Sequence, residues 1–144
     1  MPYATVKITR HDRIAVVRFD RGRDPNPLSY QTLRELTDAA RSFEDAVDVT
    51  VVVLAGRERV FTAGVDLKDP EAGRLMAASI GVRRQAAAVG ANMCRAWETM
   101  PQVTIAAIEG YCLGGGVSLA VSCDFRVAGI SAYIEKRTPE FKGE

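Results

Sequence analysis

Two glycine-bearing loops carry the residue types best suited to chemistry in this chain. Residues 110–116, Gly-Tyr-Cys-Leu-Gly-Gly-Gly, close a strand-like run and open an apolar segment that reaches Cys123. Glycine lets backbone N–H groups approach a ligand without a Cβ in the way, and the start of a helix favours negative charge. Residues 61–67, Phe-Thr-Ala-Gly-Val-Asp-Leu, follow another strand-like run and offer a facing donor. The two loops therefore indicate stabilisation of an oxyanion and chemistry on a carbonyl group.

Spacing alone leaves structural alternatives open for these residues. Close packing of a helix on a strand also requires glycine, and neither a P-loop nor the dinucleotide-binding spacing of glycines is present. Ser118 lies three residues beyond Gly115, so on a helix the two share a face and the hydroxyl can point toward whatever the glycine amide holds. Asp66 can be a cap, a solvated loop charge or a ligand contact. Glu109 can be an acid or base, or a surface charge.

The strands that must position the two loops follow an α/β pattern. Short β-branched runs at residues 3–9 and 14–19 predict a β-hairpin. Continuous apolar runs at 50–55 and 103–108 are typical of strands buried on both faces, and residues 125–128 are expected to add a further strand. Strands that alternate with helices predict right-handed β-α-β crossovers and parallel pairing.

Helical segments are expected between these strands. Ser29 is placed to cap an amphipathic helix that reaches about residue 46, and residues 114–122 predict a short helix. Residues 70–100 are compatible with a helix capped at Asp69, but three glycines weaken that helix, so we expect breaks or mobility in it. These glycines are Gly73, Gly81 and Gly90.

Composition favours a single globular domain without a polyanionic partner. The chain has 144 residues, 47% of them apolar, which suffices for one buried core. The 19 basic and 18 acidic residues leave no strong field, which argues against nucleic acid and membrane surfaces as partners. The start lacks the apolar core of a signal peptide, and the longest uncharged run, 111–123, is shorter than the ~20 residues that span a bilayer. A cytoplasmic location is therefore expected.

The cysteines and the histidine exclude several kinds of catalytic site. The three cysteines are odd in number, lie among apolar residues and form no CxxC pair. We interpret them as buried thiols of a reducing compartment rather than metal ligands. His11 is the only histidine, so zinc sites and Ser-His-Asp or Cys-His catalysis lack their parts. We expect no metal site.

Three motifs together resemble those of a known family. The stretch 105–128, Ile-Ala-Ala-Ile-Glu-Gly-Tyr-Cys-Leu-Gly-Gly-Gly-Val-Ser-Leu-Ala-Val-Ser-Cys-Asp-Phe-Arg-Val-Ala, resembles the signature of the crotonase superfamily, the enoyl-CoA hydratase/isomerase proteins. Phe-Thr-Ala-Gly-Val-Asp-Leu-Lys at 61–68 is similar to its second hallmark, and Asn-Pro-Leu-Ser at 26–29 to its third. The resemblance implies a crotonase-like (ClpP/crotonase) ββα spiral core, an acyl-CoA thioester as ligand and assembly into trimers or hexamers.

The resemblance also implies roles for individual residues. The family stabilises a thioester enolate with two backbone amides, one from each loop, which correspond to those of Val65 and Gly115. CoA is expected along the first loop and the glycine triplet, with its phosphates near the segment 21–23, and no cofactor is implied beyond the CoA of the substrate. The residues expected to contact CoA are Ala63, Gly64, Asp66, Leu67, Arg23 and Gly114.

The chain departs from the family pattern in two respects. Ser118 stands where the family's hydratases carry a glutamate, which makes a plain hydration mechanism doubtful; isomerases lack that glutamate, and hydroxycinnamoyl-CoA hydratase-lyases have serine there. Family members are about twice as long, so residues 1–129 correspond to an acyl-CoA-binding core that stops before the C-terminal helices. Residues 130–144 form a divergent or incomplete tail. The alternatives are an enzyme of the hydratase/isomerase type and a binding or assembly module that has lost turnover.

Overall fold

The computed structural model describes residues 2–129, which form one sheet with helices beside it. The tail expected at 130–144 lies outside the described residues. The sheet has the order β1-β2-β3-β4-β5. β1 and β2 pair antiparallel, and the other neighbours pair parallel. The predicted hairpin and parallel α/β sheet are thus confirmed. The strands are β1 (Val6–His11), β2 (Ile14–Phe19), β3 (Val51–Ala55), β4 (Val103–Ile108) and β5 (Phe125–Ala128).

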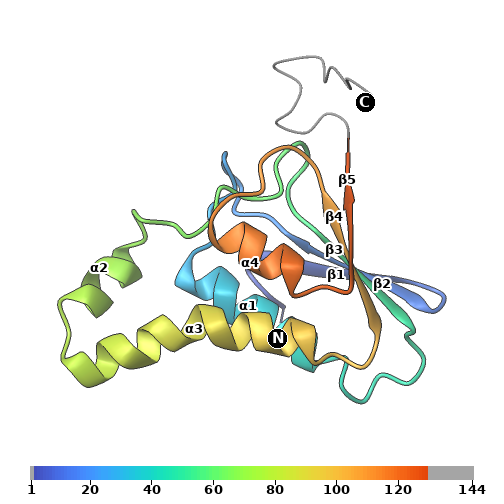
Figure 1. Cartoon of the computed structure of the whole chain (residues 1–144), viewed down its shortest axis with the longest axis horizontal. Coiled ribbons are helices and arrows are strands. Elements are labelled where there is room, and N and C mark those ends of the chain that lie inside the picture. Colours follow the sequence, from blue (N-terminus) through green and yellow to red (C-terminus); the bar gives the residue numbers. More distant parts are fainter. Residues whose placement is uncertain (1, 130–144) are drawn as a thin grey trace, which may run out of the picture.

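Helices lie to one side of this sheet (Figure 1). They are α1 (Tyr30–Arg41), α2 (Pro70–Met76), α3 (Ile80–Glu98) and α4 (Gly115–Val121). Ser29 caps α1 as predicted, its hydroxyl accepting the Thr32 N–H at 3.1 Å. The helix ends at Arg41 rather than near residue 46, because the chain continues in tighter turns. In one of them the Phe43 N–H donates to the Ala40 carbonyl, three residues back.

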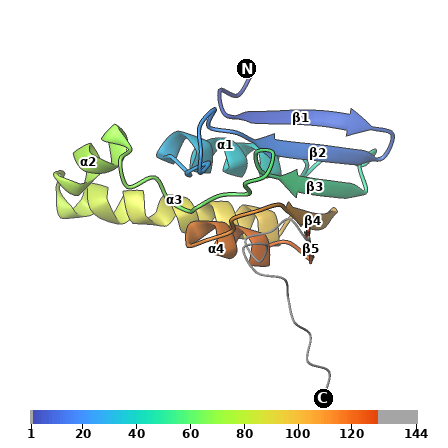
Figure 2. The same cartoon turned by 90° about the horizontal axis from the view of Figure 1, so that it is seen from above.

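The 70–100 segment is broken as predicted, but the break does not lie at a glycine. α3 runs without interruption through Gly81 and Gly90, and α2 contains Gly73. The one interruption, at residues 77–79, contains no glycine. An isolated glycine costs a helix only about 1 kcal/mol, which the packing of α3 against α1 outweighs. α2 and the first turns of α3 project away from the sheet (Figure 2).

The sheet buries one face and leaves the other partly open. Strand alternation and register place Val17, Leu54 and Ala106, all fully buried, on the face toward the helices. The opposite face carries Val103 and Phe125, whose exposed fractions are 43% and 59%. The prediction that β3 and β4 are buried on both faces is therefore wrong for the described residues: Val51 and Val53 of β3 and Val103 and Ile105 of β4 lie on the face that no described helix covers. No helix in this part of the chain is long and apolar enough to cross a bilayer.

Candidate functional site

Asn26 anchors the first loop from a fully buried position. Its backbone has φ +54°, and its side-chain amide donates to the carbonyls of Phe19 at 3.2 Å and Phe61 at 2.8 Å. Its Oδ1 accepts the Arg21 N–H at 2.9 Å. A buried amide with all these bonds fixes three chain segments relative to one another. The role of Asn26 is therefore to position the loop that precedes α1.

Thr62 joins the two glycine-bearing loops. Its hydroxyl donates to the Asn26 carbonyl at 2.6 Å and accepts the Gly64 N–H at 3.0 Å. Its backbone N–H donates to the Tyr111 carbonyl at 2.8 Å, and its carbonyl accepts the Leu113 N–H at 3.1 Å. These bonds hold the loop after β3 beside the loop after β4, as parallel strands that end at one edge require.

The backbones of Val65 and Gly115 meet where these loops adjoin. The Leu28 N–H donates to the Gly64 carbonyl, and its carbonyl accepts the Asp66 N–H, both at 2.8 Å, so the Val65 N–H is turned away from this ladder. A Cβ placed on Gly115 would lie 3.8 Å from the Val65 nitrogen. Neither the Val65 nor the Gly115 N–H donates a hydrogen bond to any residue within 2–129. Two free donors side by side suit one developing oxyanion.

Glycine is needed at two positions of this arrangement. Gly64 has φ +98°, and a Cβ there would lie 2.9 Å from the Leu113 carbonyl oxygen and 3.3 Å from the Gly115 nitrogen. A Cβ on Gly116 would overlap the Thr62 methyl group. Close packing, one of the two alternatives left open by the sequence, is thus observed at Gly116, and anion binding by the triplet stays a prediction.

A cavity of about 200 Å³ opens directly beside the two donors. Gly115 and Ser118 both line this cavity, so they lie on the same side of α4, as their spacing predicts. Helices α1 and α3 supply the rest of the wall, which sequence reasoning missed. The signal was present, because Gly90, Met93 and Cys94 recur at spacings of three and four. The lining residues are Leu33, Val65, Gly90, Ala91, Met93, Cys94, Gly115 and Ser118.

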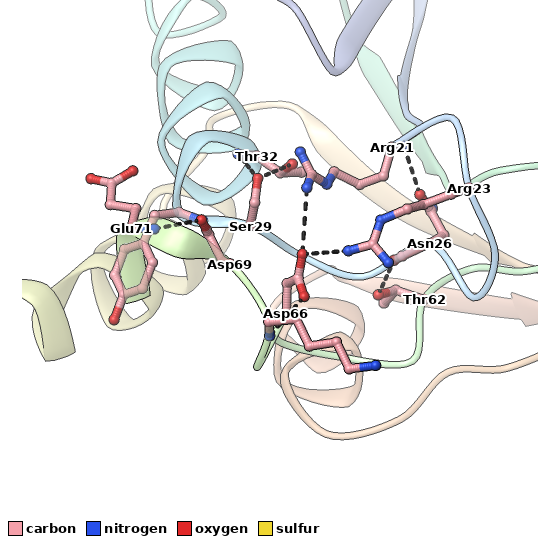
Figure 3. Close-up of polar contacts among 11 residues, drawn as sticks. Arg21, Arg23, Asn26, Ser29, Thr32, Thr62, Asp66, Asp69 and Glu71 are labelled. Atoms are coloured by element: carbon pink, nitrogen blue, oxygen red, sulfur yellow. Dashed lines mark hydrogen bonds and ion pairs between the residues drawn. The ribbon is translucent and has the colours of Figure 1, made fainter. Parts of the chain in front are cut away.

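Asp66 ties two arginines to the first loop (Figure 3). Its buried carboxylate pairs with the guanidinium groups of Arg23 at 2.7 Å and Arg21 at 3.4 Å, and its Oδ1 accepts the Lys68 N–H at 3.0 Å. Two guanidinium groups on one carboxylate leave a net positive charge, and the Arg23 side chain is half-exposed. Of the roles considered for Asp66, a structural one is observed: its carboxylate holds the two arginines and the Lys68 N–H at the first loop. The excess positive charge of the arginines lies at the edge of that loop.

The loop backbone has few free groups to offer a ligand. The Ala63 N–H donates to the Pro25 carbonyl at 3.0 Å, and the Asp66 N–H is used by Leu28. Within the described chain this leaves the Ala63 carbonyl and the N–H of Leu67, whose side chain is 92% exposed. The Gly114 backbone, at φ +51°, borders the same edge.

Other candidate side chains lie apart from the cavity. The Glu109 carboxylate accepts the Arg59 N–H at 3.2 Å and does not line the cavity. The cysteines are free thiols, and burial raises the pKa of Cys123 to about 12 and that of Cys112 above its usual value. These two thiols are therefore protonated at neutral pH and are poor nucleophiles. No group of His, Cys, Asp and Glu within residues 2–129 could hold a metal ion.

Comparisons with known proteins identify the family of the chain. The family model described as enoyl-CoA hydratase/isomerase matches residues 9–141. A probable enoyl-CoA hydratase of Mycobacterium bovis is 32% identical over 99% of this chain and 52% of its own length. The crotonyl-CoA hydratase of Syntrophomonas wolfei is 32% identical over 92% of the chain and 49% of that protein.

Solved structures show the same relationship. An enoyl-CoA hydratase from Bacillus anthracis aligns with TM-score 0.78 and 33% identity, over 89% of this chain and 48% of that one. A putative enoyl-CoA hydratase from Streptomyces coelicolor aligns with TM-score 0.83 and 27% identity, over 91% and 47%. The chain thus spans about half the length of the proteins it matches.

Proposed function

Since the chain belongs to the enoyl-CoA hydratase/isomerase family, we propose that it binds acyl-CoA thioesters and stabilises their enolates with the N–H groups of Val65 and Gly115. The observation that carries the proposal is the pair of free donors at the mouth of an apolar cavity. A thioester oxygen gains negative charge as its α-carbon becomes an enolate. A preorganised backbone donor in such a site is worth about 3 kcal/mol.

The remainder of CoA is proposed to lie along the first loop. The Ala63 carbonyl and the Leu67 N–H are free to meet the adenosine, and Gly114, where a Cβ would meet only the Gly64 Cα atom at 3.9 Å, allows a ligand to approach the backbone. Arg23, held by Asp66, is half-exposed and suits a phosphate group. This assignment uses the loop that links β3 to α2 as the CoA contact and the cavity as the acyl contact.

Titration with acetoacetyl-CoA tests the proposal without requiring turnover. This thioester has an acidic α-carbon, and its enolate absorbs in the ultraviolet, so a site that stabilises the enolate increases that absorbance on binding. We expect a saturable absorbance rise that free CoA reverses by competition. Binding without any enolate signal would contradict the oxyanion role, and absence of binding by the folded protein at millimolar thioester would contradict the ligand.

A binding module with impaired turnover is the second candidate, and the cavity lining favours it. Ser118 replaces the hydratase glutamate, and the described residues that line the cavity include no carboxylate. A serine hydroxyl orients water or a substrate oxygen but is not a strong general base. Hydration of crotonyl-CoA by the chain is therefore expected to be weak. Rapid hydration would show that another group, with Glu109 or Asp66 as candidates, transfers the proton.

A further inference from the structure

The walls of the cavity restrict the chemistry of any group that enters it. The side chains of Leu33, Val65 and Met93 are apolar, and the polar side chains are limited to the Cys94 thiol and the Ser118 hydroxyl. No charged side chain occurs among the described lining residues. A carboxylate or ammonium group on the tail would lose its water and meet no side chain of opposite charge among the described lining residues, because the two free N–H groups are assigned to the thioester oxygen. The cavity is therefore suited to uncharged acyl tails.

The volume of the cavity sets the size of the tail. An apolar protein cavity of about 150 Å³ holds one benzene molecule. The cavity here measures about 200 Å³, so it has room for a single ring. An acetyl group would leave most of this space unfilled, and it would make few van der Waals contacts with the wall of the cavity. Ring-sized tails therefore complement the cavity better than acetyl.

Gly90 is, with Gly115, one of the two described wall residues that have no side chain. It lies in the interior of the 19-residue helix α3, where glycine lowers helix stability relative to alanine. A Cβ at Gly90 would meet no atom within 4 Å outside the helix backbone, so close packing does not require glycine there. This contrasts with Gly116, where a Cβ would overlap Thr62. Because Gly90 lines the cavity and has open space around its Cα, we expect a larger residue at position 90 to reduce the volume of the cavity.

From these observations, and resting on the proposed acyl-CoA function, we propose that the chain selects uncharged, ring-sized acyl tails and that Gly90 is the specificity-determining residue. The preference comes from apolar contact area within the cavity. The oxyanion donors act on the thioester oxygen, which is common to all thioesters, so they do not discriminate between tails. Filling the space at Gly90 should consequently act on the tail and not on the CoA moiety.

Isothermal titration with two thioesters tests the proposal on the chain as it exists. We expect the parent chain to bind phenylacetyl-CoA about tenfold more tightly than acetyl-CoA. The Gly90→Leu variant should lose this ratio, and Gly90→Ala should lose part of it, which covers the case in which leucine disturbs folding. Gly81→Leu is the matched control, because it lies in the same helix, has the same open surroundings and does not line the cavity.

The outcomes separate this proposal from the proposed function. Binding of acetyl-CoA with no preference for the ring would overturn the selectivity and leave the acyl-CoA function standing. An unchanged ratio in both Gly90 variants, or an equal loss in Gly81→Leu, would overturn the role of Gly90. Absence of binding for both thioesters by the folded parent chain would overturn the acyl-CoA function and this proposal with it.

Discussion

At Val65 and Gly115 the group proposed to act is the backbone N–H, which every residue except proline possesses. Composition therefore gives no sign of such a site, and in the sequence it is visible only through the glycines that admit a ligand. The structure adds what spacing lacks: the Val65 and Gly115 backbones are adjacent, their N–H groups donate to no described residue, and both residues line one cavity. The sequence therefore predicts the two loops of the candidate site. It does not predict where the loops meet, because buried groups such as Thr62 fix that point.

Substitutions at Gly115 distinguish the backbone donor from the space around it. Gly115→Pro removes the N–H at the first position of α4, where proline is tolerated. Gly115→Ala adds a Cβ near the Val65 side chain, at 3.2 Å, but keeps the N–H. We expect proline to reduce enolate formation or turnover about a hundredfold and alanine to have a much smaller effect. Equal losses in the two variants, measured with acetoacetyl-CoA, would assign the effect to crowding.

At the scale of elements, the packing of helices on one another and the turns that follow them decide where helices break and end, which local propensity leaves open. The sequence predicts a break in the 70–100 segment but attributes it to the glycines, whereas α3 runs through Gly81 and Gly90, because the packing of α3 against α1 cannot be read from single residues. The end of α1 is similarly set by turns after Arg41 that have no strong sequence signal. The strands, in contrast, follow from β-branched runs that are strong local signals.

The contact between α4 and the first loop should respond to a paired substitution. Gly116→Ala places a methyl group against the Thr62 Cγ2 atom and is expected to destabilise the fold by about 1–3 kcal/mol. Thr62→Ser removes that Cγ2 atom and keeps the hydroxyl that bonds to Asn26 and Gly64. In urea unfolding the double variant should therefore be more stable than the sum of the single effects predicts. Strict additivity would mean that the two groups do not clash.

The link between the N-terminal segment and α1 should depend on pH through Glu35. Partial burial raises the pKa of this carboxyl, but hydrogen bonds from Ala4, Thr5 and Gln31 together outweigh burial and hold the pKa below its ordinary value of 4.5. A carboxyl with a lowered folded pKa stabilises the fold above its unfolded pKa, and this contribution disappears as the pH falls through the folded value.

Glu35→Gln should therefore cost about 1 kcal/mol at pH 7, a value reduced for partial exposure, and progressively less as the pH falls below 4.5. Urea midpoints at pH 7 and pH 3 measure the difference between parent and variant. Glu98→Gln, at an exposed position of α3, serves as the control. A loss that is the same at both pH values would show that the charge of Glu35 does not contribute.

At the scale of the whole molecule, the open face of the sheet is the feature that sequence reasoning misjudged. The continuous apolar runs of β3 and β4 resemble strands covered on both sides, yet within residues 2–129 helices cover only one. The fold class, the hairpin and the parallel pairing follow from local patterns and from the resemblance to the family. Burial of a face depends on what lies against it, which a strand's own residues do not encode.

Exposed apolar residues on this face predict association between copies of the chain. Phe125 and Val127, with 59% and 61% exposure, lie on the same side of β5, and the register places Phe125 beside Ile105 of β4. A contiguous apolar surface of this kind binds other apolar surfaces. We expect concentration-dependent self-association in sedimentation and bright fluorescence from a dye that binds apolar surface.

Phe125→Ser combined with Val127→Thr should weaken both signals, because the two substitutions remove apolar area where it is already in contact with water. The same exposure limits their effect on folding to about 0.5 kcal/mol each. Val47→Thr is the matched control, since Val47 is 92% exposed but lies in the connection between α1 and β3, away from the sheet face. Undiminished self-association of the double variant would mean that the copies contact each other through another surface. An equal decrease in the Val47 variant would mean that the effect depends on the total exposed apolar area and not on the sheet face.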